Sequence, residues 1–234
     1  MLGLLWKVIS GCISNTKWDG RAGNLLTKLK ERIQLLMVGE ARLAHSIGLT
    51  PNHVSVLGVL SALFSAYLYW SSQFEVALLT VAAIFLLISG FLDALDGVLA
   101  RLYGEVTVFG GFLDSLLDRY ADAFVFLGII LGWLIKDSVW VFWGFAALVG
   151  SLLVSYSRAR AEAAGIKMET VGIAERAERI ITLVVATLLS MVWTDALRWS
   201  MVLLAVLTNL TVLQRVIYFR KASKKKEATT TPIV

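Results

Sequence analysis

The chain alternates long apolar runs with short polar breaks, a pattern typical of helices that cross a membrane several times. A run of roughly 20 apolar residues is long enough to span a bilayer. We predict six such helices, at about 51–72, 75–101, 106–135, 138–163, 175–194 and 196–220. Thr50 and Pro51 mark the start of the first helix, because threonine caps helix N-termini and proline suits the first helical position. The pattern therefore predicts an all-α membrane protein with six transmembrane helices.

The two ends of the chain differ from this apolar part, which we assign to one domain at residues 49–221. Within residues 1–48, leucines and isoleucines recur at helical spacing beside Lys28 and Arg32. This pattern favours an amphipathic juxtamembrane helix that lies in the membrane interface. Residues 222–234 form a basic tail that we expect to be disordered and to be attracted to anionic lipid.

The basic residues fall mostly on one side of the predicted helices. Of the 22 Lys and Arg residues, only Lys136 and Arg198 lie near the connections on the opposite side. Lys and Arg are enriched in the cytoplasmic loops of membrane proteins. The distribution predicts a multi-pass protein of the cell membrane whose termini both lie in the cytoplasm. With 58% hydrophobic and 17% charged residues, the chain has little room for a soluble domain, and no nucleic-acid partner is expected.

Carboxylates interrupt the cytoplasmic ends of the second and third predicted helices. Asp93 and Asp96 share one helical face, and Asp114 and Asp118 share another. These side chains can converge in an apolar protein only if cations offset their charge. Oxygen-only ligands suit Mg²⁺, Mn²⁺ or Ca²⁺ rather than Zn²⁺, and the single cysteine, Cys12, excludes a cysteine metal site.

Internal ion pairing is the structural alternative to a metal site. The two helices carry five aspartates, Asp122 included, but only two arginines, Arg101 and Arg119. Pairing within the two helices would leave excess negative charge. The count therefore favours metal over pairing.

The spacing Asp93-x2-Asp96-Gly97-x2-Ala100-Arg101-x8-Gly110-x3-Asp114-x3-Asp118 resembles, without departure, the signature of the CDP-alcohol phosphotransferase family. The resemblance implies transfer of a phosphatidyl-type group from a CDP-lipid to an alcohol, with release of CMP, in phospholipid biosynthesis. It also implies two divalent ions, Mg²⁺ or Mn²⁺, held by Asp93, Asp96, Asp114 and Asp118. Asp118 is then the candidate base for the acceptor hydroxyl, although a bound cation lowers the basicity of a carboxylate.

The same resemblance implies a binding site for CDP-diacylglycerol or CDP-archaeol, and the sequence leaves the choice of lipid open. Small side chains on the signature face let the nucleotide and its phosphates approach the helix. The residues expected to contact the CDP-lipid are Pro51, Asn52, Asp93, Asp96, Gly97, Ala100 and Arg101.

The acceptor alcohol is indicated by polar residues at the ends of the fourth to sixth helices. Several arginines beside an acidic metal site suit a phosphorylated acceptor, because Arg binds phosphate in a bidentate manner. The candidates for the acceptor phosphate are Arg158, Arg179, Arg215, Arg176 and Ser155. Each arginine could instead be an ordinary helix-end cation paired with a nearby glutamate.

The segments around these arginines resemble the phosphatidylinositol phosphate and archaetidylinositol phosphate synthases of prokaryotes, which implies inositol 1-phosphate as acceptor. The nearest alternative is a phosphatidylglycerophosphate synthase that uses glycerol 3-phosphate. A cation transporter or a scaffold with internal ion pairs is a more distant alternative, and no internal repeat supports the transporter. The family resemblance also implies a homodimer, with Gly144 and Gly150 as a candidate packing face.

Overall fold

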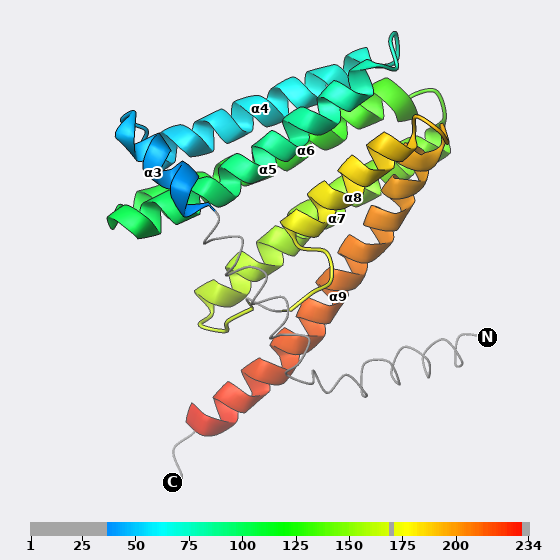
Figure 1. Cartoon of the computed structure of the whole chain (residues 1–234). Coiled ribbons are helices and arrows are strands. Elements are labelled where there is room, and N and C mark those ends of the chain that lie inside the picture. Colours follow the sequence, from blue (N-terminus) through cyan, green and yellow to red (C-terminus); the bar gives the residue numbers. More distant parts are fainter. Residues whose placement is uncertain (1–36, 169–170, 231–234) are drawn as a thin grey trace, which may run out of the picture.

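The computed structural model describes residues 37–168 and 171–230, and every regular element within these residues is a helix. Figure 1 shows their arrangement. The helices are α3 (Val38–Ser46), α4 (Pro51–Ser71), α5 (Leu78–Tyr103), α6 (Val108–Ile129), the π-helical segment η1 (Ile130–Leu134) that continues α6, α7 (Ser138–Ala163), α8 (Arg176–Leu189) and α9 (Ala196–Thr230).

Four of these helices, α4, α5, α7 and α9, are long and apolar enough to cross a membrane. The chain thus has the helices of a multi-pass membrane protein. The helices at the third and fifth predicted spans, α6 and α8, are not among these four, and the reason differs between them. Helix α6 carries Asp114, Asp118, Arg119 and Asp122, whereas α8 has 14 residues and is about 21 Å long at 1.5 Å per residue.

The predicted helix starts agree closely with the structure, and the cap of α4 explains one of them. The Thr50 side chain accepts a hydrogen bond from the backbone N–H of His53, and Pro51 occupies the first turn. At the N-terminal end, α3 is the described part of segment 1–48. The expected amphipathic helix around Lys28 and Arg32 lies outside the described residues.

The expectation of a disordered tail from residue 222 is wrong for its described part, because α9 continues to Thr230. The extended part of α9 contacts the end of α7. Lys226 Nζ donates a 3.0 Å hydrogen bond to the carbonyl of Ala164, the residue that caps the C-terminus of α7. Carbonyls at a helix C-terminus lack intrahelical partners, so the lysine satisfies one of them.

The helices form two groups, which are joined by α8 and by the contact of α6 and η1 with α7 (Figure 1). Helix α4 packs on α5 and α6, α7 packs on α9, and α8 contacts both α5 and α9. Buried polar side chains link the helices. The Ser65 hydroxyl donates to the Ala82 carbonyl at 2.8 Å, and the hydroxyls of Tyr69 and Thr187 lie 2.7 Å apart. Alternating helix directions bring the C-terminal parts of α5 and α7 to the same end as the starts of α6 and α8.

Gly144 and Gly150 contact helices of their own chain. A Cβ atom on Gly144 would meet the side chains of Ile130 and Leu134 at 2.7–2.8 Å, and one on Gly150 would overlap Thr208 of α9. Close approach of α7 to its neighbours therefore requires both glycines. The two glycines thus form a packing face as expected, and the partners that they contact are helices of the same chain.

Candidate active site

The signature aspartates line one small cavity between α5 and α6. The cavity has a volume of about 10 Å³, close to the space that one water molecule needs. Its polar lining includes Asp93, Asp96, Asp114 and Asp118. The two acidic helix faces therefore meet in the structure, as the sequence predicts.

Three of these aspartates are arranged in a way that fits a divalent cation. Asp93, Asp114 and Asp118 each offer a carboxylate oxygen, and these oxygens all lie within 4.8 Å of one another. Oxygen ligands of Mg²⁺ lie about 2.1 Å from the ion, so two of them are at most about 4.2 Å apart. Small side-chain adjustments would let the three carboxylates hold one hard cation.

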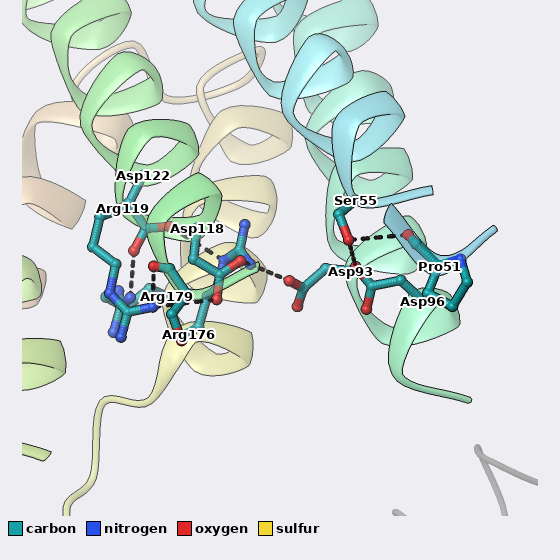
Figure 2. A network of polar contacts seen from close by, with 10 residues as sticks. Pro51, Ser55, Asp93, Asp96, Asp118, Arg119, Asp122, Arg176 and Arg179 are labelled. Atoms are coloured by element: carbon teal, nitrogen blue, oxygen red, sulfur yellow. Dashed lines mark hydrogen bonds and ion pairs between the residues drawn. The ribbon is translucent and has the colours of Figure 1, made fainter. Parts of the chain in front are cut away.

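Asp96 is oriented differently from the other three. It is buried, and its Oδ2 accepts a 2.5 Å hydrogen bond from the Ser55 hydroxyl on α4. Ser55 also lies 3.1 Å from the carbonyl of Pro51, which places the start of α4 beside the aspartates (Figure 2). Sequence reasoning missed Ser55. Its position one helical turn after Pro51 was the available signal.

Arg176, the first residue of α8, lies among the aspartates. Its Nη1 atom contacts Oδ1 of Asp93 and Oδ1 of Asp118, and its Nε lies 3.4 Å from Oδ1 of Asp122 (Figure 2). We predicted Arg176 as a residue for the acceptor phosphate. The structure instead pairs it with two of the predicted metal ligands, while it also lines the neighbouring arginine-rich cavity.

The charge balance at the aspartates differs from the prediction. Helices α5 and α6 supply five aspartates and only two arginines, Arg101 and Arg119. The structure adds Arg176 and Arg179 from α8, because Arg179 pairs with Asp122. Internal ion pairing is therefore a larger part of this site than the sequence indicated, and the carboxylate geometry rather than the charge excess is what supports metal binding.

A second cavity of about 190 Å³ adjoins the aspartates. Among the residues that line it are all five predicted for the acceptor phosphate: Ser155, Arg158, Arg176, Arg179 and Arg215. They come from three helices, α7, α8 and α9. The fold therefore gathers the candidates that sequence spacing could only suggest separately.

Protein groups hold each of the other three arginines in place. Arg179 pairs with Asp122 and donates to the Ala174 carbonyl at 3.1 Å. Arg215 donates through Nε to the Val171 carbonyl at 2.8 Å, and through Nη1 to the carbonyl of Val154.

Arg158 forms an exposed pair with Glu162 at 2.9 Å, so the alternative of a helix-end cation paired with a glutamate does occur at this arginine. Glu175 also lines the cavity, 4.0 Å from Arg215 Nη2. Glu175 therefore brings a negative charge to a cavity that several arginines line.

The loop that leads into α8 is fixed on α9. The backbone N–H groups of Ile173 and Ala174 donate to Thr211 Oγ1 at 3.2 and 3.1 Å. Gly172 adopts φ +132°, and a Cβ atom there would overlap Thr211. This anchoring places Arg176 at the boundary between the two cavities.

The remaining residues predicted for the CDP-lipid lie around the aspartates. Arg101 folds back over its own helix, with Nη1 3.3 Å from the position that a Cβ on Gly97 would take. A Cβ on Gly110 would lie 2.9 Å from Thr107 Oγ1 and 3.3 Å from Asn52 Oδ1. The two signature glycines thus permit close contacts with side chains at this edge of the site.

Apolar helices of membrane-spanning length, a carboxylate cluster of metal-binding geometry and an adjoining arginine-lined cavity define a class: membrane enzymes that act on phosphate-bearing substrates. The sequence profile of CDP-alcohol phosphatidyltransferase matches residues 48–213. The chain belongs to this family, and it is a transferase of phospholipid biosynthesis. The resemblance inferred from the signature is thereby confirmed.

Several proteins are similar to the chain over most of its length. The archaetidylinositol phosphate synthase of Pyrococcus horikoshii is 40% identical over 197 residues, which cover 84% of this chain and 97% of that protein. The crystal structure of the Mycobacterium tuberculosis phosphatidylinositol phosphate synthase with CDP-DAG bound matches with a TM-score of 0.70 and 32% identity, covering 78% of this chain and 92% of that one. A second structure of that enzyme, in complex with manganese and citrate, has the same TM-score, 33% identity and coverage of 78% and 88%.

Proposed function

We propose that the protein transfers a phosphatidyl-type group from a CDP-lipid to inositol 1-phosphate and releases CMP. The observation that carries this proposal is the arginine-lined cavity that shares Asp118 and Arg176 with the carboxylate cluster. A phosphorylated acceptor that binds there has its hydroxyl groups next to the aspartates. The similarity to archaetidylinositol phosphate and phosphatidylinositol phosphate synthases supports inositol 1-phosphate as this acceptor.

The donor side of the proposed site consists of the signature residues. Asp93, Asp96, Asp114 and Asp118 would hold two divalent ions, which supply charge neutralisation of the diphosphate and of the departing CMP. The similar enzyme crystallised with manganese supports a divalent ion of this kind. Asn52, Pro51, Gly97, Ala100 and Arg101 would surround the nucleotide.

The acceptor side is preorganised by the contacts of its arginines. Arg179 and Arg215 are buried and held by protein oxygens, so they lose little freedom when a phosphate binds. Arg158 and Ser155 lie on the α7 side of the same cavity. Together they would hold the phosphate of the acceptor and orient its hydroxyl toward Asp118.

Asp118 faces both cavities, which suits it to the transfer itself. The acceptor oxygen forms a bond to the donor phosphorus as the bond from that phosphorus to the CMP oxygen breaks. The hydroxyl donates a hydrogen bond to Asp118, which orients the oxygen and accepts the proton as the new bond forms. Positioning is the larger contribution where a bound cation lowers the basicity of the carboxylate.

We further propose that α6 with η1 and the short α8 cross the membrane beside the four apolar helices, which makes six spans. Both termini and the site would lie in the cytoplasm, as the distribution of basic residues supports. Segment 1–48 would lie in the interface, and the protein would act as a homodimer in the cell membrane.

The reaction is tested with the purified protein, radiolabelled CDP-diacylglycerol or CDP-archaeol, and one acceptor at a time. We expect a lipid product and CMP with inositol 1-phosphate, and loss of both when a chelator removes divalent ions. Product with glycerol 3-phosphate alone would overturn the proposed acceptor. Comparison of the two donors identifies the lipid, and serine serves as a control acceptor without phosphate.

A further inference from the structure

Arg176 contacts two of the three aspartates that could hold a cation. Its Nη1 atom reaches Asp93 and Asp118 together, and both aspartates belong to the set whose oxygens lie within 4.8 Å of one another (Figure 2). A guanidinium and a divalent cation cannot both occupy the space between these oxygens. Each neutralises the same carboxylates, so one must leave when the other binds.

The structure also provides a place for the guanidinium to go. Arg176 Nε already lies 3.4 Å from Asp122, one helical turn beyond Asp118. It has no hydrogen-bond partner among the described residues, so a short movement toward Asp122 would satisfy it. Beyond lies the cavity of about 190 Å³ that Arg176 lines together with Arg158, Arg179 and Arg215.

We propose that Arg176 and a divalent cation are alternative occupants of the Asp93–Asp118 pair, and that cation binding moves Arg176 into the acceptor cavity. Arg176 is thus a positioning residue that couples the two halves of the site. Its second role, toward the acceptor phosphate, rests on the proposed function, whereas the competition with the cation does not. The anchored loop before α8 keeps the backbone of Arg176 in place while its side chain moves.

Movement of Arg176 between the two cavities makes binding of the cation and binding of the acceptor cooperative. A cation that displaces Arg176 adds a fourth arginine to the acceptor cavity, which raises its affinity for phosphate. By thermodynamic linkage the acceptor must raise the affinity for the cation by the same factor. The acceptor would therefore bind well only when the cation is present.

The competition is tested by titrating the purified full chain in detergent with Mn²⁺, followed by electron paramagnetic resonance, without lipid donor or acceptor. Arg176→Gln removes the competing guanidinium, and we expect Mn²⁺ to bind roughly ten- to a hundredfold more tightly, within the usual range of coupling. Arg119→Gln is the matched control because it removes a positive charge 3.8 Å from Oδ2 of Asp118, whereas Arg176 contacts Oδ1 of Asp118 and also Asp93. We expect at most about a fivefold gain from this partly exposed pair.

An Arg176→Gln affinity no greater than that of Arg119→Gln, or weaker than wild type, would overturn the competition. Thermal unfolding in detergent checks that each variant is folded. Should Arg176→Gln not fold, Arg176→Lys carries the test, since the single nitrogen of lysine cannot replace both Nη1 at Asp93 and Asp118 and Nε at Asp122, and it therefore competes less strongly. We then expect the lysine variant to bind Mn²⁺ more tightly than wild type, and an unchanged affinity would contradict the proposal.

The coupling is tested by repeating the Mn²⁺ titrations with inositol 1-phosphate present. We expect tighter Mn²⁺ binding in the wild type and a much smaller effect in Arg176→Gln, while chelation by the free acceptor affects both equally. Equal effects would overturn the coupling. These titrations contain no CDP-lipid, so failure of the transfer reaction with inositol 1-phosphate contradicts the proposed function without changing the Arg176→Gln result.

Discussion

The Ser55 hydroxyl donates a 2.5 Å hydrogen bond to Asp96, and both side chains are buried where α4 meets α5. Ser55→Ala should lower kcat about tenfold, because a hydrogen bond to a charged group contributes about 1.5–3 kcal/mol and Asp96 would lose its fixed orientation. The rate of CMP release measures the effect. Ser61→Ala is the control, since Ser61 makes a 2.8 Å bond to the Phe85 carbonyl away from the site. Equal kcat values for the two variants would contradict a role of Ser55 in the site.

Asp114 is a predicted cation ligand whose carboxylate is near those of Asp93 and Asp118. Asp114→Asn should reduce activity more than about a hundredfold, since even groups that only support metal ligands cost 10–100-fold. Mn²⁺ should raise the Tm of the wild type but not of the variant, because only a protein that binds the ion is stabilised by it.

The matched control for this experiment is Asp137→Asn. Asp137 caps α7 through a 2.9 Å bond from the Val139 N–H, and asparagine caps helices equally well. This variant should retain activity and the response to Mn²⁺. A Mn²⁺-dependent rise in Tm that persists in Asp114→Asn would show that Asp114 does not hold the ion.

Asp122 fixes Arg179, whose side chain is only 4% exposed. Asp122→Asn should raise the KM for inositol 1-phosphate about tenfold, because a neutral partner holds the buried guanidinium less firmly than a charged one. The KM for the CDP-lipid should not change. Steady-state kinetics with each substrate varied in turn measure both values.

Glu162→Gln tests the same idea at an exposed pair. Arg158 and Glu162 are each 43% exposed, and exposed ion pairs contribute about 0–1 kcal/mol. The acceptor KM should therefore stay within about fivefold of wild type. If Glu162→Gln raised the acceptor KM more than Asp122→Asn does, Arg158 rather than Arg179 would be the more important arginine for the acceptor phosphate.

Gly110 and Gly111 are adjacent in α6 but have different surroundings. A Cβ on Gly110 would meet the Thr107 hydroxyl at 2.9 Å, whereas one on Gly111 would have nothing within 4 Å. That hydroxyl caps α6 by accepting a bond from the Gly110 N–H. Gly110→Ala should therefore lower both Tm and activity by disturbing the cap and Asn52, and Gly111→Ala should preserve activity. Thermal unfolding and CMP release distinguish the two, and equal losses would argue against a local steric cause.

The sequence predicted the helices and the convergence of the aspartates because both depend on local spacing. Apolar runs define each helix, and residues three or four apart must share a face. The partners of the aspartates could not be found in this way. Arg176 lies 83 residues from Asp93 and 58 from Asp118, so no periodicity connects them. Only the packing of α8 against α5, with Arg176 reaching Asp118 of α6, shows that an arginine enters the carboxylate cluster.

At the C-terminal end, the local composition predicts disorder where the structure has a helix. The run from Arg220 to Lys226 is polar and highly charged, which favours a solvated tail. In the structure this run continues α9, and Lys226 contacts the residue that caps the end of α7. A tertiary contact of this kind leaves no signal in local composition.

The two groups of helices divide the chemistry between them. All the signature aspartates lie on α5 and α6, whereas the four arginines proposed for the acceptor lie on α7, α8 and α9. In the proposed reaction, donor binding and acceptor choice would therefore fall to different helices, which meet where Asp118 and Arg176 line both cavities. Related enzymes could change their acceptor by altering the second group of helices alone, and a chimera that exchanges residues 138–230 between relatives should inherit the acceptor of the C-terminal parent.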